Sequence, residues 1–369
     1  MYPLNTTKKT ILLTMFCFTV VISMSNKFSL EPSYSQDIIN NSPDNEVFNI
    51  AIAGDWGCTE DTEKTAENIR KKNPEVVIGS GDYSYTGSAD CWFDIIKAFK
   101  SNMKIAMGDH EYSDTSGGAI GIINQYLKPL NLEKTYYSFN MNNVHVTIID
   151  PYIDYEPDSA QYQFIEQDLK TAFINPKIDW TFVVESIPIY TSPSDHPADS
   201  KIRDIYHPLF DKYGVDLVFS SDNHNYQRTF PLKYNSEDDS SNNPIVSYSN
   251  QNNYYNTNEY NSEDDSSNNP IVSYSNQNNY YNTNDGVIYL IIGTAGRSLY
   301  DIEEQAPFVS KQYDEQFGFL NIDIYPNNVL RGTFYANEDD DEPQYYSVST
   351  TNNNMIDRFI ISNMKSHEQ

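Results

Sequence analysis

The sequence predicts an α/β fold, in which strands of a parallel sheet alternate with helices. The first observation is an apolar run, Val47–Ala53, which suits a buried strand and is followed by Gly54-Asp55. The second is that two more apolar runs, Val76–Ile78 and Met103–Met107, also lead into a Gly-Asp pair. The third is the strand-loop-helix-strand spacing between these runs, which is typical of βαβ units.

The aspartates of these three pairs, Asp55, Asp82 and Asp109, are expected to lie near one another. The carboxyl ends of neighbouring parallel strands meet at one edge of the sheet, so the loops that follow them converge there. The glycine before each aspartate lets the backbone turn sharply and approach a ligand closely. The sequence therefore predicts a cluster of carboxylates at one sheet edge.

Helices are predicted between the strands. The first begins at a cap formed by Thr59 or Asp61, and the second covers Asp90–Phe99. The later elements are expected as a hairpin of Tyr136–Phe139 and Val144–Ile149, helices over Asp158–Phe173 and Ser200–Tyr213, and strands over Trp180–Val184, Val215–Phe219, Val287–Ile292, Phe317–Ile324, Leu330–Phe334 and Met355–Ile361.

The chain has 369 residues, enough for one large domain or two modest ones, and a formal net charge of -28. This charge argues against nucleic acid or an anionic lipid surface as a partner. An anionic substrate would need a local positive charge, and a bound metal ion is the obvious supplier. The sequence does not indicate an oligomeric state.

The N-terminus resembles an export signal, because Lys8 and Lys9 precede an apolar run from Ile11 to Ser25 that is short for a membrane span. Residues 1–25 are therefore interpreted as a signal peptide, with cleavage after Ser25 or as late as Ser35; an uncleaved membrane anchor is the alternative. A polar linker, 26–46, and a tail, 363–369, flank the expected domain, 47–362. The protein is expected to be extracellular or at the cell surface.

Two cysteines, Cys58 and Cys91, remain after such cleavage. An oxidising compartment favours a disulfide between them, and two free thiols are the alternative. Each cysteine lies just beyond one of the Gly-Asp loops, so a bridge would tie these loops together.

The segment 234–284 contains a tandem duplication, in which residues 234–258 recur without change at 260–284. Two copies are too few for a solenoid, and the composition is polar and acidic without core periodicity. The segment is expected to be a low-complexity surface insertion; binding of cations or glycans is the alternative.

The Gly-Asp blocks resemble those of the purple acid phosphatases, a branch of the calcineurin-like metallophosphoesterases. Gly54–Gly57 matches the family block GDxG, and Gly81–Tyr85 matches GDxxY. Tyr226 and Arg228 match the Tyr-x-Arg stretch after the last block. The resemblance covers about residues 47–362 and implies a four-layer αββα sandwich of two mixed sheets flanked by helices.

The resemblance also implies a pair of metal ions that clamp a phosphate. The first metal would take Asp55, Asp82, Tyr85 and His224, with Asp82 bridging to the second. A phenolate, carboxylates and one imidazole form a hard anionic ligand set that suits iron(III).

The second metal site departs from the family pattern. Asp109 stands where the family has Asn, and Ser186 and Asp222 each stand where it has His. This exchange leaves a site of oxygen ligands only, which predicts manganese, magnesium or calcium, or an empty second site.

His110 matches the family's catalytic histidine beside the leaving group. The resemblance implies a secreted metal-dependent phosphatase acting on small phosphate monoesters; a degenerate metal- or phosphate-binding homologue and a phosphodiesterase are the alternatives. Arg228 is expected to be a structural ion-pair partner. The remaining histidines match no motif and are interpreted as structural or surface residues: His145, His196, His207 and His367.

Overall fold

A computed structural model describes residues 47–113, 119–235, 245–246, 279–337 and 354–363. It contains two seven-stranded mixed sheets with helices on their outer faces, which confirms the predicted α/β sandwich. In the first sheet the strand order is β11 (Tyr280–Asn282), β16 (Met355–Ser362), β15 (Val329–Ala336), β14 (Gly318–Tyr325), β1 (Phe48–Ala53), β2 (Val76–Gly79) and β3 (Met103–Ile105).

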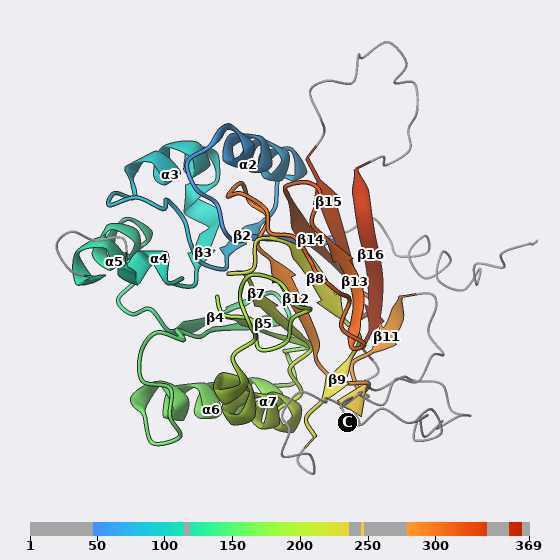
Figure 1. Cartoon of the computed structure of the whole chain (residues 1–369). Helices are drawn as coiled ribbons and strands as arrows, with labels where there is room; N and C mark the ends of the chain where they lie inside the picture. Colours follow the sequence, from blue (N-terminus) through green and yellow to red (C-terminus); the bar gives the residue numbers. More distant parts are fainter. Residues whose placement is uncertain (1–46, 114–118, 236–244, 247–278, 338–353, 364–369) are drawn as a thin grey trace, which may run out of the picture. The chain divides into compact units, whose positions relative to one another are not determined.

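The second sheet has the order β13 (Val309–Tyr313), β8 (Tyr226–Thr229), β12 (Ile288–Ile292), β7 (Leu217–Ser220), β6 (Trp180–Val184), β5 (Val144–Ile148) and β4 (Tyr137–Met141). A two-stranded sheet pairs β9 (Leu232–Lys233) with β10 (Ile245–Val246). Helices α2 and α3 lie beside the first sheet, while α6 and α7 cover the second (Figure 1). The helices are α2 (Glu60–Lys72), α3 (Asp90–Ile95), α4 (His110–Ser113), α5 (Ala119–Leu127), α6 (Ala160–Phe173) and α7 (Ser200–Lys212), with 3₁₀ turns at Ile96–Ala98, Lys100–Asn102 and Lys128–Leu130.

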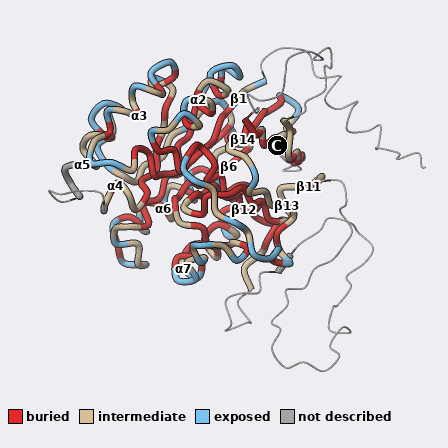
Figure 2. The backbone as a smooth tube through the Cα atoms, turned by 45° about the horizontal axis from the view of Figure 1, so that its top comes forward, coloured by how far each residue is buried: buried red, intermediate tan, exposed pale blue. Residues whose placement is uncertain are grey.

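The alternation of side chains along the strands builds the layers. On β1, Ile50 and Ile52 join the core between the two sheets, whereas Ala51 and Ala53 face the helices on the other side. Successive strand residues point to opposite faces, so one apolar strand serves both layers. Figure 2 shows that the buried backbone is concentrated in these strands.

The three strands with Gly-Asp ends are neighbours, as the sequence predicts. Strands β1, β2 and β3 pair in parallel and in this order at one side of the first sheet. Helix α2 is capped at its N-terminus by Thr59, whose hydroxyl accepts the N–H of Thr62 at 3.1 Å. A threonine in this position satisfies a backbone donor that the helix leaves free, so it fixes where the loop after β1 ends.

Several elements differ from the sequence prediction. Strands β8 and β13 and helix α5 were not predicted, and the helix expected over Asp90–Phe99 ends at Ile95 and continues as a 3₁₀ turn. The prediction that the whole insertion is a surface loop is wrong at its end. Residues Tyr280–Asn282 form β11, which pairs in parallel with β16, and Tyr281 is buried.

The predicted signal peptide, linker and most of the tail lie outside the described residues, as do His367 and most of the insertion. Within the part of the chain that the structure describes, no helix is both long and apolar enough to cross a bilayer.

Candidate metal centre

The predicted metal ligands lie in loops that follow parallel strands of both sheets. Asp55 follows β1, Asp82 and Tyr85 follow β2, and Asp109 follows β3; Asp222 and His224 follow β7 of the second sheet. Backbone hydrogen bonds join these loops, for example from Trp56 N to Asp82 O at 2.8 Å. The fold therefore gathers donors that are up to 169 residues apart in the sequence, from Asp55 to His224.

Three of the donors expected at the first site are in mutual contact. The phenol oxygen of Tyr85 lies 2.8 Å from Oδ1 of Asp55 and 3.0 Å from Nε2 of His224. The same His224 nitrogen lies 3.3 Å from Oδ1 of Asp55. Ligands bound about 2.1 Å from a common ion lie roughly 3 Å apart, so these separations fit a shared metal.

Two further observations support this fit. The other carboxylate oxygen of Asp55, Oδ2, is buried and has no hydrogen-bond partner among the described residues. In addition, four of the expected ligands have positive φ angles: 56° for Asp55 and Asp82, 54° for Tyr85 and 68° for Asp222. Non-glycine residues rarely adopt this conformation, and such strain is typical of functional sites.

The ring of His224 is oriented by the main chain. Its Nδ1 donates a hydrogen bond to the carbonyl oxygen of Ser298 at 2.6 Å, which directs Nε2 toward Tyr85 and Asp55. A carbonyl only accepts, so the proton must be on Nδ1. This is the arrangement that usually orients a metal-binding imidazole.

Glu111 organises the loops around Asp82. Its buried carboxylate accepts the backbone N–H groups of Asp82, Tyr83 and Gly108, each at 2.9 Å. Burial raises the pKa of Glu111 to about 7, although these three hydrogen bonds oppose the shift. Gly108 has to be glycine, because a Cβ there would overlap the carboxylate of Asp82.

The cluster carries strong negative charge. Burial raises the pKa of Asp82 well above its usual range, and the neighbouring Glu111, Asp55 and Asp109 raise it further. Burial, followed by Asp55 and Asp109, raises the pKa of Asp222 to about 7. Burial and the same negative charges also raise the pKa of the Tyr85 hydroxyl, so phenolate ligation requires a cation to offset them.

The second cluster contains Asp109, Ser186 and Asp222, as the resemblance implies, together with a tyrosine that the sequence did not indicate. The Ser186 hydroxyl donates to the phenol oxygen of Tyr152 at 3.3 Å. Burial raises the pKa of the Tyr152 hydroxyl, and the charges of Asp222, Asp82 and Asp109 raise it further, which places this phenol within electrostatic reach of the cluster.

His110 lies between the two clusters. Its ring centroid is 4.0 Å from that of Tyr85, and its Nε2 is 3.9 Å from Oδ1 of Asp109. Ligand atoms of Asp82, Asp109 and His110 all lie within 4.8 Å of one another, a separation compatible with one bound cation. His110 can therefore meet either a metal or a substrate.

The structure brings other residues to the site that sequence reasoning missed. His196 lies with Nδ1 4.0 Å from Oδ2 of Asp222, although it matches no motif. Tyr300 stacks on His224 with 3.9 Å between ring centroids, and the guanidinium carbon of Arg297 lies 4.6 Å from the centre of the Tyr85 ring. The signal that could have pointed to Arg297 and Tyr300 is the Gly-Thr-Ala-Gly stretch before them, which follows β12 at the same sheet edge.

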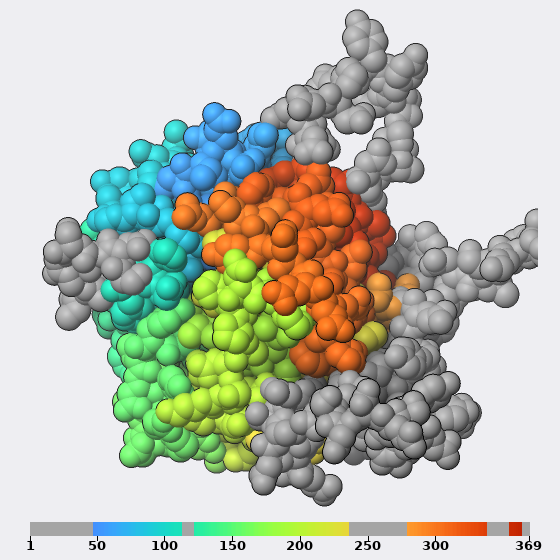
Figure 3. Space-filling view, in the orientation of Figure 1, coloured from blue at the N-terminus to red at the C-terminus, as the bar shows by residue number. Residues whose placement is uncertain are grey.

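These missed residues belong to two chain segments that meet beside the site. On the face shown in Figure 3, the yellow-green surface near residue 200 adjoins the orange surface near residue 300. Two hydrogen bonds join these segments: Ser194 Oγ donates to Asp301 O at 3.0 Å, and Glu303 N donates to Pro193 O at 3.1 Å.

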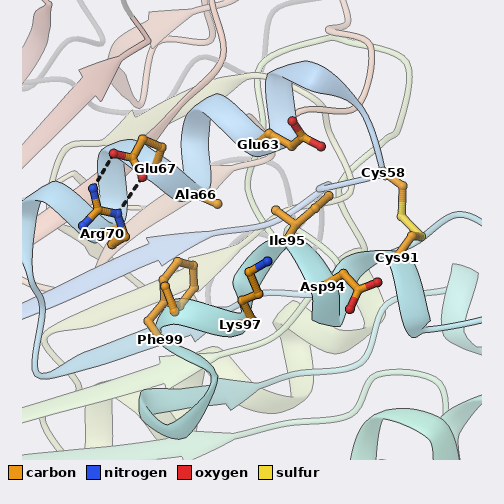
Figure 4. A pocket seen from close by; sticks show the side chains of 11 residues that line it. Cys58, Glu63, Ala66, Glu67, Arg70, Cys91, Asp94, Ile95, Lys97 and Phe99 are labelled. Atoms are coloured by element: carbon orange, nitrogen blue, oxygen red, sulfur yellow. Dashed lines mark hydrogen bonds and ion pairs between the residues drawn. A yellow bond between two sulfur atoms is a disulfide. The ribbon is translucent and has the colours of Figure 1, made fainter.

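Cys58 and Cys91 form a disulfide that links the loop after β1 to the start of α3. The bridge closes one end of a surface groove between α2 and α3, and the ion pair of Glu67 and Arg70 lies toward its other end (Figure 4). The groove is lined by none of the predicted metal ligands, and the disulfide joins the chain just beyond the loop of Asp55 to the chain beyond the loop of Asp82 and Tyr85.

The other residues singled out from the sequence are structural. Arg228 is fully buried and pairs with both carboxylate oxygens of Asp357, at 2.7 and 3.1 Å. His145 is buried on β5, and its Nε2 lies 2.9 Å from Oδ2 of Asp168 on α6. Glu185, which precedes Ser186 and was not singled out from the sequence, is fully buried, and burial and the charge of Asp199 raise its pKa well above its usual range.

Comparisons with known proteins identify the family of this chain. Residues 48–226 match the family model described as calcineurin-like phosphoesterase. Probable purple acid phosphatase 20 of Arabidopsis thaliana is 28% identical over 220 residues, covering 53% of this chain and 50% of that protein. Purple acid phosphatase 21 of the same plant is 30% identical over 205 residues, covering 52% and 46%. The chain thus matches about half the length of these relatives.

A solved structure shows the same fold. Purple acid phosphatase PPD1 from yellow lupin seeds superimposes with a TM-score of 0.63 at 21% identity, covering 87% of this chain and 55% of that one. Residues 48–226 therefore form a calcineurin-like phosphoesterase domain, and the chain is a homologue of the purple acid phosphatases.

Proposed function

We propose that this chain is a metal-dependent phosphatase that hydrolyses small phosphate monoesters. The observation that carries the proposal is the mutual contact of Asp55 Oδ1, the Tyr85 hydroxyl and His224 Nε2, which lie 2.8–3.3 Å apart. The second carboxylate oxygen of Asp55 is buried and has no hydrogen-bond partner among the described residues. With Asp82, these three residues form the ligand set that suits iron(III) at the first site. Asp109 and Asp222 belong to the second site.

Bound metal ions would lower the pKa of a water molecule and offset the charge of the phosphate. His110, beside both clusters, would donate a proton to the leaving oxygen. The exposed guanidinium of Arg297, above the Tyr85 ring, would attract the phosphate at the mouth of a site that is otherwise acidic.

The test is a metal count, with identity, on protein purified without added metals, followed by assays with iron, manganese, calcium and zinc across a range of pH. Chromogenic phosphate monoester and diester substrates separate the proposed phosphatase from a phosphodiesterase. His224→Ala is expected to abolish turnover, because it removes the nitrogen donor of the first site. Metal binding without turnover under any of these conditions would contradict the proposal.

That outcome would favour a second candidate, a degenerate homologue that binds a metal or phosphate without turnover. One specific contact favours this candidate: at the second site, Ser186 and Tyr152 provide two hydroxyl groups where the resemblance expects an imidazole.

Secretion is part of the same proposal. The disulfide between Cys58 and Cys91 is of the kind that persists in oxidising compartments, and the N-terminal sequence has the composition of an export signal. Mature protein is expected to begin after Ser25 or Ser35. N-terminal sequencing of membrane-bound material that finds Met1 would instead favour an uncleaved anchor.

A further inference from the structure

The loop that follows β12 is joined by hydrogen bonds to the predicted ligands of the first site. Arg297 N donates to the carbonyl oxygen of Asp55 at 2.9 Å, and Tyr300 N donates to that of His224 at 3.0 Å. The carbonyl oxygen of Ser298 accepts Nδ1 of His224 at 2.6 Å. Each of these three loop residues therefore contacts a predicted ligand through its main chain.

The same loop is fixed at the N-terminus of α2. The hydroxyl of Thr59 donates to the carbonyl oxygen of Gly296 at 3.0 Å. Gly296 has a φ of 154°, and a Cβ there would lie 2.5 Å from the backbone nitrogen of Thr62. Only glycine allows this close approach of loop and helix. The backbone position from which the Arg297 side chain extends is therefore fixed by contacts on both sides.

The side chain of Arg297 lies over the ring of Tyr85. Its guanidinium carbon is 4.6 Å from the centre of that ring, and the phenol oxygen of the same ring contacts Oδ1 of Asp55 at 2.8 Å. The arginine stem passes Gly57, where an added Cβ would lie 3.9 Å from Cδ of Arg297. A cation over an aromatic face is attracted to it, and a negative charge on the ring strengthens the attraction.

From these contacts we propose that Arg297 is a positioning residue of the first metal site that acts through Tyr85. The positive charge over the ring lowers the energy of the electrons of the phenolate ligand and so helps to retain it beside the carboxylate of Asp55. This inference rests on the proposed function, because it needs a metal at the first site. It goes beyond the attraction of phosphate at the mouth, because it acts in the protein without substrate.

The test is the visible spectrum of the iron-loaded protein in the absence of phosphate. The expected band arises when an electron leaves the phenolate ring, and a positive charge over the ring opposes this step. Arg297→Gln is therefore expected to move the band to longer wavelength by roughly tens of nanometres, since a charge at this distance changes the energy by several times the thermal energy. Competition with a chelator is expected to show weaker iron binding in the same variant.

Two further variants separate the charge from other effects. Arg297→Lys keeps the charge and is expected to stay closer to the wild-type wavelength and iron affinity. Arg70→Gln is the matched control, because it removes an exposed arginine that pairs with Glu67 in a groove lined by none of the predicted ligands. It is expected to leave the band unchanged. All three substitutions are at exposed side chains and keep the backbone contacts, so the fold is expected to remain intact.

An unchanged band in Arg297→Gln would overturn the inference, and a raised KM in that case would confine Arg297 to binding phosphate. Equal shifts in Arg297→Gln and Arg297→Lys, or loss of iron from both, would also overturn it, because the charge would then not be the cause. If the band shifts as expected but the wild-type protein hydrolyses no phosphate ester, the inference stands and only the proposed function fails. A wild-type protein that binds iron without this band would overturn the inference together with the proposed ligand set.

Discussion

The hydroxyl of Ser186 and the phenol of Tyr152 are joined by a hydrogen bond across 3.3 Å, beside the second metal site. The two residues are 34 positions apart in the sequence and follow neighbouring strands, β5 and β6. A longer side chain at position 186, such as histidine, would extend toward the Tyr152 hydroxyl that Ser186 contacts. The serine at position 186 is therefore coupled to Tyr152. Replacing Ser186 by histidine without also changing Tyr152 is expected to disturb the second site.

This contact shapes a prediction for the second site. The triple variant Asp109→Asn, Ser186→His and Asp222→His restores the family ligands, and it is expected to raise phosphatase activity only when Tyr152→Ala is added to make room. Coupled substitutions in one site are not additive, so each single change is expected to do little. Activity and metal content of the triple and quadruple variants are the measurements. A parent enzyme that turns over as fast as the quadruple variant would show that the second site works as it stands.

The proposed iron(III) at the first site predicts a visible band from charge transfer between Tyr85 and the metal. Tyr85→Phe is expected to abolish this band, because the phenol oxygen that contacts Asp55 and His224 is removed. Tyr300→Phe is the matched control: it changes the tyrosine that stacks on His224 and is expected to keep the band. Absorbance spectra with iron counts separate loss of the ligand from loss of iron. A band that persists in Tyr85→Phe would reject this tyrosine as the ligand.

The buried pair of Arg228 and Asp357 predicts a pH dependence of stability. Burial alone would raise the pKa of Asp357, but the charge and hydrogen bonds of Arg228 outweigh it and hold this pKa below its usual range. Because the pKa is lower in the folded chain than in the unfolded chain, the contribution is complete above about pH 4, the usual pKa of the unfolded group, and is lost as pH falls through the folded pKa.

Asp357→Asn leaves the buried guanidinium unpaired and is expected to reduce the free energy of unfolding by about 3–5 kcal/mol near neutral pH. The difference from wild type is expected to shrink below about pH 4, where wild type begins to lose the same contribution. Denaturant unfolding at several pH values measures both effects. Asp323→Asn is the control, since the pair of Asp323 with Arg331 is partly exposed and should matter less. A loss that is the same at every pH would contradict this account.

The packed end of the insertion gives a further prediction. Tyr281 is buried in β11, and its hydroxyl accepts a hydrogen bond from Arg228 at 2.9 Å. Tyr281→Ala is therefore expected to lower the free energy of unfolding by about 3 kcal/mol. Tyr255→Ala removes the equivalent side chain of the first copy and is expected to cost less.

The double variant Tyr255→Ala and Tyr281→Ala tests whether the copies exchange. If Tyr281→Ala alone is mild and the double variant loses the full amount, the first copy replaces the second in β11. A double variant as stable as wild type would show that neither tyrosine stabilises the fold.

The elements that could be predicted from the sequence are those with a regular apolar pattern. Strands β1 and β2 have buried residues on both faces and a Gly-Asp end, so their order and the position of Asp55 and Asp82 follow from local signals. Strand β13 lies at a sheet edge, and most of its residues are polar and half-buried, so it lacks a regular apolar pattern. Strand β8 is short, directly follows the Asp222 loop and also lacks such an apolar pattern.

The residues of the site that were missed depend on contacts between distant segments. Asn223, 27 residues later, holds the backbone of His196 beside the site, and Tyr152 lies there in contact with Ser186. Nothing in the neighbouring sequence of either residue encodes these contacts. Single-sequence reasoning thus finds ligands inside motifs and misses the residues that tertiary structure places beside them.

Strand β11 is the Tyr-Tyr-Asn near the end of the second repeat, and the first repeat has the same three residues at Tyr254–Asn256. The copies begin 26 residues apart, at 234 and 260. Removing residues 234–259 or residues 259–284 yields the same polypeptide, because each deletion takes out one copy together with Glu259. In that product Tyr-Tyr-Asn-Thr-Asn still precedes Asp285. A chain that gains or loses whole units in this way is therefore expected to keep the edge strand beside β16. Alleles that differ in the number of copies are expected to encode equally well-folded proteins.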